Sequence, residues 1–273
     1  MNVEQRETMD SLINGLNSED VEIRKKAIEI AVNSHDDEIV DRLIQLIQEQ
    51  DVGPDSREAA AIALAQMPSG RCGEFLLQLI CSDDPGLRGI ASLGLGHLQT
   101  EASMSALIEA LADKVNTVRN LAERSLLKMV EVVREKGVEQ LLDLLSHPIP
   151  LTRSPAARVI GKTRDPRALD PLLQILRSDR QWLARLWAAK GLGYLAMVEA
   201  FDALAEAMQS DEKNRVRAAA AEAIGKLRTP KSKELLQKAL KDEDGGVRKV
   251  AEEALGALHQ AGFEEDYDPF AED

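Results

Sequence analysis

The chain has 273 residues, with 47 acidic and 34 basic side chains and a formal net charge of −13. Aromatic residues make up 3% of it and no run alternates β-branched with polar residues, so we expect an all-α protein. The acidic balance disfavours non-specific binding to nucleic acid. No apolar run is as long as a membrane span, and residues 1–16 lack a basic start with an apolar centre. We therefore expect no signal peptide, no membrane association and a cytoplasmic location.

An arginine recurs along the chain at intervals of 31 to 34 residues. The repeated positions are Arg24, Arg57, Arg88, Arg119, Arg153, Arg185, Arg217 and Arg248. Alanine follows each of them after three residues, and Ala, Leu or Ile follows after seven. These two positions are one helical turn apart and share a face. A repeat of this period predicts stacked helical units.

Each repeat is predicted to contain two helices. The first carries the repeated arginine and, in five repeats, a glycine eight residues later, where the helix could stop or a neighbouring backbone come close. The second follows about twenty residues after the arginine as an apolar block, at 43–47, 76–80, 141–145 and 172–176. Such short amphipathic helices need neighbours to be stable, and a stacked array supplies them.

The runs at 84–96, 179–193, 211–225 and 242–256 share an Asp, then Arg-x-x-Ala, then Ile or Leu before Gly. They resemble HEAT repeats, in the short form similar to the repeats of phycobilisome lyase subunits. The resemblance covers residues 18–261. It implies a right-handed α-solenoid, an armadillo-like superhelix of about eight helical hairpins, and it implies no particular activity.

The expected organisation has three parts: a capping helix at 1–17, the solenoid at 18–261 and a tail at 262–273. The tail has six acids, no bases and three aromatic residues, so we expect it to be disordered. An insertion near 135–137 is expected to lengthen the first helix of the fourth repeat. Pro155 is expected to begin the first helix of the fifth repeat, because proline disrupts a hydrogen-bonded turn.

Aspartates precede many of the repeated arginines, at Asp20, Asp84, Asp113, Asp179, Asp211 and Asp242. Each is placed to cap its helix and to meet the guanidinium group of its own or the neighbouring repeat. We interpret them as a structural clamp between repeats.

Residues for catalysis are not evident in the sequence. The histidines, His35, His97, His147 and His259, each lack a partner at the spacing of metal ligands, and no metal or cofactor is predicted. Cys72 and Cys81 are interpreted as reduced thiols. No sequence signature of a serine or cysteine nucleophile and no glycine-rich phosphate loop occurs.

One polar residue recurs in the middle of the second helices, 21 residues after the arginine in six of seven repeats and 24 after it at Asp143. These residues are Gln45, Gln78, Glu109, Asp143, Gln174, Glu206 and Lys238. The family resemblance implies that second helices line the concave side. The residues would then form either an ordinary solvated edge or an acidic and amide groove for a basic or extended peptide.

The charge reverses between residues 153 and 190, which hold nine bases and three acids. Trp182 could pack against the prolines of the fifth repeat or serve as an exposed anchor beside arginines, whereas Trp187 is expected in the core. The candidate protein-binding residues are Glu109, Asp143, Gln174, Glu206, Arg153, Arg164, Arg167, Arg180 and Trp182.

We therefore expect a non-enzymatic scaffold or adaptor that binds a protein or peptide through its concave face and the basic, Trp-containing patch. The alternatives are an accessory lyase-type subunit that holds a bilin, with Tyr194, Arg185 and Trp182 as its candidate cluster, and a HEAT-like DNA-binding protein. The acidic tail is either a solubilising end or a peptide that docks on a basic surface through Phe263, Tyr267 and Phe270.

Overall fold

A computed structural model describes residues 3–34, 36–49 and 51–260, with the side chains described from residue 7 onwards. Every regular element within these ranges is helical, which confirms the expected all-α class. The chain forms two compact units, residues 1–137 and 138–273. The acidic tail expected at 262–273 lies outside the described residues.

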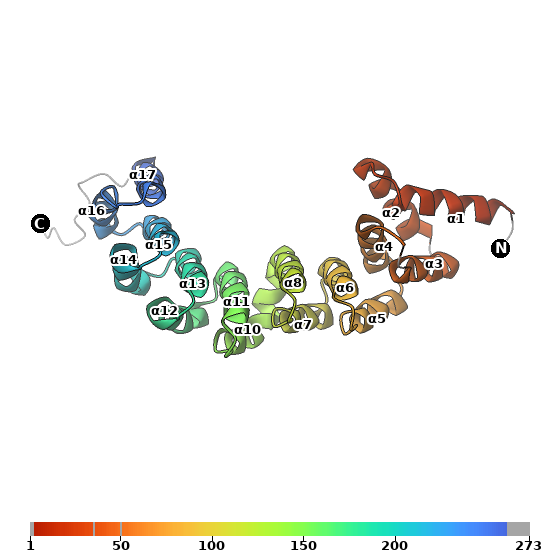
Figure 1. The fold of residues 1–273 in the computed structure, drawn as a ribbon, viewed down its shortest axis with the longest axis horizontal. Coiled ribbons are helices and arrows are strands. Elements are labelled where there is room, and N and C mark those ends of the chain that lie inside the picture. The colour runs from red at the N-terminus through yellow and green to blue at the C-terminus, as the bar shows by residue number, and fades with distance from the viewer. Residues whose placement is uncertain (1–2, 35, 50, 261–273) are drawn as a thin grey trace, which may run out of the picture. The chain divides into compact units, whose positions relative to one another are not determined.

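Successive helices pair as hairpins in both units (Figure 1). We call the helices that carry the repeated arginines the first helices and those that follow them the second helices. The first unit contains α1 (Val3–Leu16), α2 (Val21–Ser34), α3 (Asp37–Gln48), α4 (Pro54–Gln66), α5 (Gly70–Leu79), α6 (Pro85–Leu98), α7 (Glu101–Ala110), α8 (Asn116–Lys128), α9 (Val130–Val132) and the π-helix η1 (Val133–Gly137).

The second unit contains α10 (Val138–Leu145), α11 (Pro150–Thr163), η2 (Pro166–Ala168), α12 (Leu169–Ser178), α13 (Trp182–Leu195), η3 (Val198–Ala200), α14 (Phe201–Ser210), α15 (Asn214–Leu227), α16 (Pro230–Ala239) and α17 (Gly245–Gln260). Its first helices are α11, α13, α15 and α17. Those of the first unit are α2, α4, α6 and α8.

The two repeated apolar positions form the core of each unit. All eight alanines at the first position are buried, as are the eight Ala, Leu or Ile side chains at the second. In α1, Leu12 and Leu16 are buried, and the helix packs against α2. Its capping role, expected from the sequence, stays a prediction.

Glycines allow successive first helices to approach closely. A Cβ atom added to Gly161 of α11 would lie 2.4 Å from the Cα of Gly191 in α13. One added to Gly193 or Gly225 would lie 2.8 Å from an alanine Cβ of the next first helix. In α11 and α13 the repeated glycine therefore marks backbone approach and not a helix end, since α11 continues to Thr163 and α13 to Leu195.

The two rows of helices within a unit are packed unequally. First helices contact one another extensively, whereas successive second helices touch only slightly. Closer spacing along one row bends a stack toward that row. In the second unit α11, α13, α15 and α17 therefore lie on the inner side of the unit's curvature (Figure 1). The expectation that second helices line the concave side is wrong for this unit.

Among the described residues, four pairs join a repeated arginine to the aspartate six residues before the next repeated arginine, and they tie successive repeats together as the clamp interpretation predicted. They are Arg88 with Asp113, Arg153 with Asp179, Arg185 with Asp211 and Arg217 with Asp242. Each is bidentate, with Nε and Nη2 donating to the two carboxylate oxygens over 2.6 to 3.0 Å. We call these pairs the Arg–Asp ladder.

Each ladder arginine also donates from Nη1 to a backbone carbonyl six residues earlier, for example Arg185 to Asp179 at 2.8 Å. Each ladder aspartate accepts a backbone N–H two residues later, as Asp179 does from Gln181 at 2.9 Å. That N–H belongs to the N-cap residue, so these aspartates precede the cap. Asp20 and Asp84 instead accept from Glu22 and Gly86 at the start of their own helices.

His147 occupies the ladder position in the fifth repeat. Its Nδ1 accepts the backbone N–H of Ile149 at 3.2 Å, and its carbonyl accepts from Arg153 at 2.7 Å. Arg119 in the first unit donates to the side chain of Asn116 at 3.1 Å and to the carbonyl of Asp113 at 2.7 Å. The histidine keeps the backbone contacts of the ladder without its carboxylate.

Pro155 lies inside α11, so the expectation that it begins this helix is wrong. The helix begins at Pro150, whose fixed φ suits the first helical position. The N–H that Pro155 lacks would have bonded one carbonyl near the helix start. The cost of that loss is one helical hydrogen bond, and the helix that includes Pro155 holds Arg153 where it donates to both Asp179 and the carbonyl of His147.

The insertion near 135–137 does not lengthen the first helix of the fourth repeat. That helix, α8, ends at Lys128, and the extra residues form α9 and the π-helix η1. Gly137 ends η1 where a Cβ would lie 2.8 Å from the Met104 sulfur, so the wider turn packs closely against α7.

We predict opposite effects for alanine at two equivalent glycines. Gly161→Ala forces a methyl group against the backbone at Gly191 and should lower the free energy of unfolding by about 2 kcal/mol. Gly256→Ala in α17 meets no atom within 4 Å and should raise it by about 0.5 kcal/mol, because alanine favours helix. Urea unfolding followed by tryptophan fluorescence measures both. A similar loss in the two variants would contradict the close approach.

The ladder is expected to contribute substantially to stability. Asp179→Asn removes the charge facing Arg153, and the two side chains are 4% and 16% exposed. We expect the free energy of unfolding to fall by about 2 kcal/mol, because the guanidinium would lose its counter-charge in a largely dry site. Asp143→Asn, an exposed change in the same unit, should alter it by less than about 0.5 kcal/mol. Equal effects in urea titrations would argue against a structural role for the pair.

Acid should weaken the ladder. Burial raises the pKa of Asp179, but hydrogen bonds from Arg153 and Gln181, with the nearby positive charges, outweigh it, so its pKa lies below the ordinary value of 3.8. The pKa values of Asp113 and Asp242 are lowered too. A group whose pKa is lower in the folded than in the unfolded chain stabilises the fold at any pH above its unfolded pKa. That stabilisation is lost as the pH falls through the folded pKa. The urea concentration at the midpoint of unfolding should fall as the pH is lowered below about 4. The fall should be steeper in the native chain than in Asp179→Asn.

Candidate functional site

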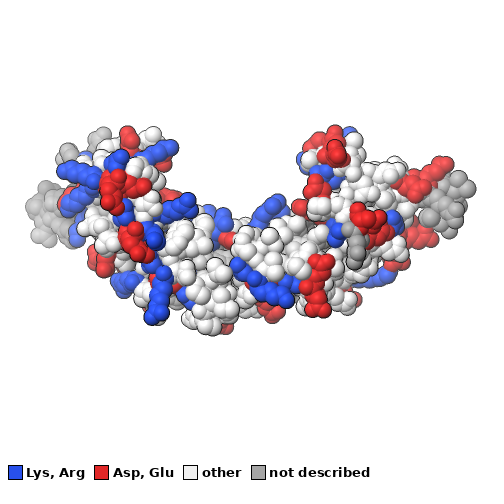
Figure 2. All heavy atoms as spheres, in the orientation of Figure 1, with Lys and Arg blue, Asp and Glu red and all other residues white. Residues whose placement is uncertain are grey.

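The inner edge of the second unit presents basic and aromatic side chains from α11, α13 and α15. Five residues after the repeated arginine these helices carry Arg158, Lys190 and Glu222, and nine residues after it Lys162, Tyr194 and Lys226. Residues four apart share a helix face, so the six side chains form a strip across the three helices. With Trp187 we call them the cation–aromatic strip. Figure 2 shows Lys and Arg side chains along this edge.

Two cations lie over the ring of Trp187. The guanidinium carbon of Arg158 is 4.4 Å from the ring centroid, and Nζ of Lys190 is 5.5 Å away. Arg158 comes from α11 and Lys190 from one turn further along α13. The indole is partly exposed, which corrects the expectation that Trp187 is a core residue. Cation–π attraction holds the charges above the ring.

Tyr194 is flanked by lysines from both neighbouring helices. Nζ of Lys162 on α11 is 3.7 Å from the ring centroid, and Nζ of Lys226 on α15 is 4.5 Å away. Lys162 is exposed and Lys226 is partly exposed. The phenol ring thus spaces two ammonium groups that remain open to solvent.

One acid belongs to the strip. Glu222 accepts from Lys226 at 2.6 Å and lies 3.5 Å from Lys190. Burial raises the pKa of Glu222, but the hydrogen bonds and charges of the two lysines lower it by more, so the pKa lies below its ordinary value. A carboxylate ionised over a wide pH range therefore helps to fix both lysines in place.

The strip is suited chemically to anionic groups. Its ammonium and guanidinium groups are held over aromatic rings, so little side-chain freedom would be lost on binding a carboxylate or phosphate oxygen. The rings offer little face for stacking, because cations already lie over them. Charge recognition is favoured over stacking of bases.

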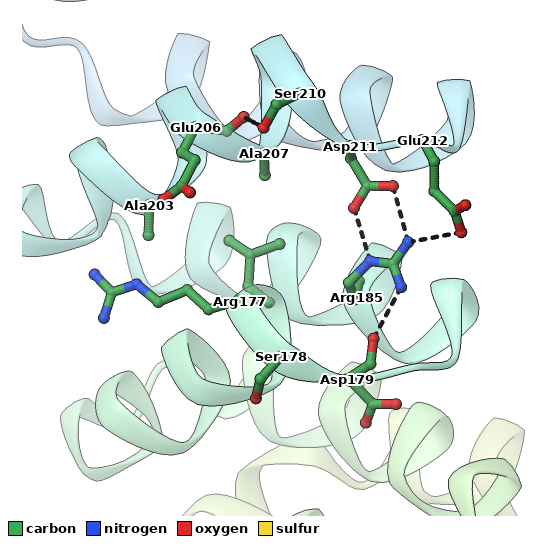
Figure 3. Close-up of a pocket in the computed structure, with 11 residues that line it drawn as sticks. Arg177, Ser178, Asp179, Arg185, Ala203, Glu206, Ala207, Ser210, Asp211 and Glu212 are labelled. Atoms are coloured by element: carbon green, nitrogen blue, oxygen red, sulfur yellow. Dashed lines mark hydrogen bonds and ion pairs between the residues drawn. The ribbon is translucent and has the colours of Figure 1, made fainter.

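The structure places the expected acidic and amide residues on the other row. Glu109, Asp143, Gln174 and Glu206 are exposed on the second helices α7, α10, α12 and α14. They do not line the inner side of the second unit. Glu206 instead lines a cavity of about 310 Å³ between α12 and α14, beside the Arg185–Asp211 pair (Figure 3).

The basic patch expected at 153–190 is divided among several surroundings. Arg153 belongs to the ladder. Arg167 on η2 forms ion pairs with Asp165 at 2.8 Å and with Glu139. Arg164 is exposed at the C-cap of α11 with a φ of 56°, and Arg180 is exposed beside a cleft of about 600 Å³ that Gln174 also lines.

Trp182 is partly exposed at the start of α13, and the guanidinium carbon of Arg215 lies 5.7 Å from its ring. The bilin cluster suggested for Trp182, Arg185 and Tyr194 is wrong. Trp182 and Tyr194 are twelve residues apart on α13, about 18 Å along the axis of a regular helix. Arg185 is engaged with Asp211 in the ladder.

Most residues of the strip were not identified as candidates from the sequence. Arg158, Lys162 and Lys190 entered only as part of a charge count, and Glu222 and Lys226 were not singled out. Their fixed offsets of five and nine residues from the repeated arginine were the available signal. That signal needed to be read on the first helices, not the second.

Two further properties concern the described residues alone. No three His, Cys, Asp or Glu side chains within 3–34, 36–49 and 51–260 gather closely enough to hold a metal ion. None of the helices in these ranges is both long and apolar enough to cross a membrane.

Solved structures share the fold at low identity. A chain of the Kap95p–RanGDP structure is 14% identical with a TM-score of 0.62, covering 93% of this chain and 40% of that one. Escherichia coli YibA is 19% identical with a TM-score of 0.50, covering 94% of this chain and 97% of YibA. The CpcE–CpcF phycocyanin lyase of Nostoc sp. PCC7120 is 19% identical with a TM-score of 0.37, covering 90% and 93%. The first two similarities concern fold alone, and the third, with a TM-score below 0.5, supports no conclusion.

No curated protein matches the chain. The sequence profile for HEAT repeats matches residues 53–127, 128–190 and 169–256, which together span most of the chain. The match includes every residue of the cation–aromatic strip and all four ladder pairs. The stacked hairpins, the repeated arginine and this match agree that the chain belongs to the HEAT-repeat family.

Proposed function

We propose that the chain is a non-catalytic binding scaffold whose cation–aromatic strip takes up an extended, acidic segment of a partner protein. HEAT-repeat arrays are commonly scaffolds for protein interactions. The carrying observation is that Tyr194 and Trp187 hold basic groups from three successive helices at fixed positions. The inner edge of the second unit replaces the second-helix groove as the main binding surface.

Spacing supports an extended peptide as the ligand. Packed helices lie about 8 to 10 Å apart, and an extended chain in the polyproline II conformation has three residues per turn and advances about 3.1 Å per residue, so residues three apart share one side about 9 Å from each other. An acidic residue at every third position would therefore meet one first helix after another, at Lys162, Lys190 and Lys226. A peptide with its acids in one block would satisfy only part of the strip.

The alternative of DNA binding has less support. The rings that would stack on bases are covered by cations, and the chain carries a net charge of −13. A bilin-binding accessory subunit lacks the convergent cluster on which that alternative depended.

The exposed residues Glu109, Asp143, Gln174 and Glu206 remain a proposed secondary contact for a basic segment. Gln174 and Glu206 line neighbouring clefts on the second-helix row of the second unit. Arg164, Arg180 and Trp182 lie elsewhere on that unit and could extend a partner's contact.

We predict that neutralising two lysines of the strip weakens the binding of an acidic peptide, and that neutralising basic residues elsewhere does not. The probe is a fluorescein-labelled 12-residue peptide with Glu at every third position and Ser elsewhere, titrated by anisotropy. Lys162→Gln with Lys226→Gln should raise Kd by on the order of tenfold, because two charge-assisted contacts are lost. Arg177→Gln with Lys231→Gln, exposed changes on second helices with the same net charge, should raise it less than about twofold.

Equal weakening by both double variants would show that bulk charge, and not the strip, attracts the peptide. Absence of binding at low salt, both to the native chain and to a chain that ends at Gln260, would refute the proposed function. A peptide of the same composition with its Glu residues in one block provides the test of spacing and should bind more weakly.

A further inference from the structure

We infer, building on the proposed function, that residues 261–273 of the same molecule occupy the cation–aromatic strip and compete with the partner. This segment reads Ala-Gly-Phe-Glu-Glu-Asp-Tyr-Asp-Pro-Phe-Ala-Glu-Asp. It holds six acids, no bases and three aromatic residues. It has the composition that the strip is proposed to bind.

The point where the segment leaves the fold favours this occupant. α17 ends at Gln260 and packs against α15, which packs against α13. The first helices run parallel, because Arg217 near the start of α15 binds Asp242 just before α17, and Gly225 near the end of α15 meets Ala254 of α17. The segment therefore begins at the helix end that also carries Lys226, Tyr194 and Lys162.

The segment is long enough to cover the strip. Lys226 lies one helix spacing from α17 and Lys162 lies three spacings away, about 30 Å in total. Thirteen extended residues reach about 43 Å. Both the nearest and the farthest lysine of the strip are within reach, with several residues to spare for the turn after Gln260.

A pocket lies along this path. It has a volume of about 230 Å³ between α15 and α17, and it is lined by Gly225, Lys226, Arg228, Val250, Ala254 and Ala257 together with Glu222 and Glu253. Its floor is formed of small residues, because Gly225 and Ala254 let the helices approach. Phe263, three residues beyond Gln260, is the first aromatic side chain that could enter it, with Lys226 and Arg228 available to the acids that follow.

Tethering makes the intramolecular occupant competitive. A flexible linker of a few residues gives an effective concentration in the millimolar range. A weak acidic segment attached beside the strip therefore excludes a free peptide of similar intrinsic affinity until that peptide is abundant. The inner edge of the second unit would be occupied until a tighter partner displaces the segment.

The test compares the full chain with a chain ending at Gln260, each with native lysines and with Lys162→Gln and Lys226→Gln. The probe is the labelled 12-residue Glu/Ser peptide. We expect removal of residues 261–273 to lower the Kd of the probe at least fivefold in the native background and to change it little in the Lys→Gln background. A matched full-length variant, with Glu264→Gln, Glu265→Gln, Asp266→Asn and Asp268→Asn, should behave like the shortened chain.

The possible failures are distinguishable. Equal probe binding with and without residues 261–273 would overturn intramolecular docking and leave the proposed function intact. If neither form binds the probe, the proposed function fails. Intramolecular docking is then judged by tryptophan fluorescence. It survives only if removal of the segment changes the fluorescence in the native background and not in the Lys→Gln background. A difference that appears only at protein concentrations where the chain dimerises would assign the occupant to a second copy and overturn the intramolecular form.

Discussion

The close approach of successive first helices is the contact on which the rest of the structure depends. Gly161 and Gly191 meet backbone to backbone, and Gly193 and Gly225 each face an alanine of the next helix. Small residues at these points let the Arg–Asp ladder close, because Arg185 can reach Asp211 only if the two repeats are adjacent and in register. Packing and the charged hydrogen bonds thus specify the same arrangement, and each limits how far the other can shift.

Unequal packing of the two rows decides which surfaces are available. The second helices are spread apart, so clefts open between them, lined by exposed side chains such as Gln174 and Glu206. The first helices are close enough for one side chain to touch its counterpart on the next helix. Tyr194 can be flanked by Lys162 and Lys226 only under this condition. The cation–aromatic strip is therefore a consequence of the glycine contacts beneath it.

The arginines of the basic region serve two different purposes. Arg153 and Arg185 pair with aspartates in the ladder, whereas Arg158 and Lys190 lie over the partly exposed ring of Trp187, and Lys190 also lies 3.5 Å from Glu222. A count of charges between 153 and 190 could not separate them, because both kinds contribute equally to the sum. Acid weakens the pair of Arg153 through Asp179, whose pKa is lowered in the fold, and the acid of the strip is Glu222, whose pKa two lysines lower.

The sequence by itself determined the helical class, the repeat, its buried alanines and the ladder, since these follow from residue type at fixed spacing on a helix of known period. It misplaced the start of α11 and the insertion after α8, because local proline and length rules do not include the tertiary contacts of Arg153 or the wider turn before Gly137. Only the tertiary structure decided which row is inner and which side chains meet. The distance between helices depends on backbone contacts that spacing along one chain does not encode, and the pairing of Lys162, Tyr194 and Lys226 from three helices depends on that distance.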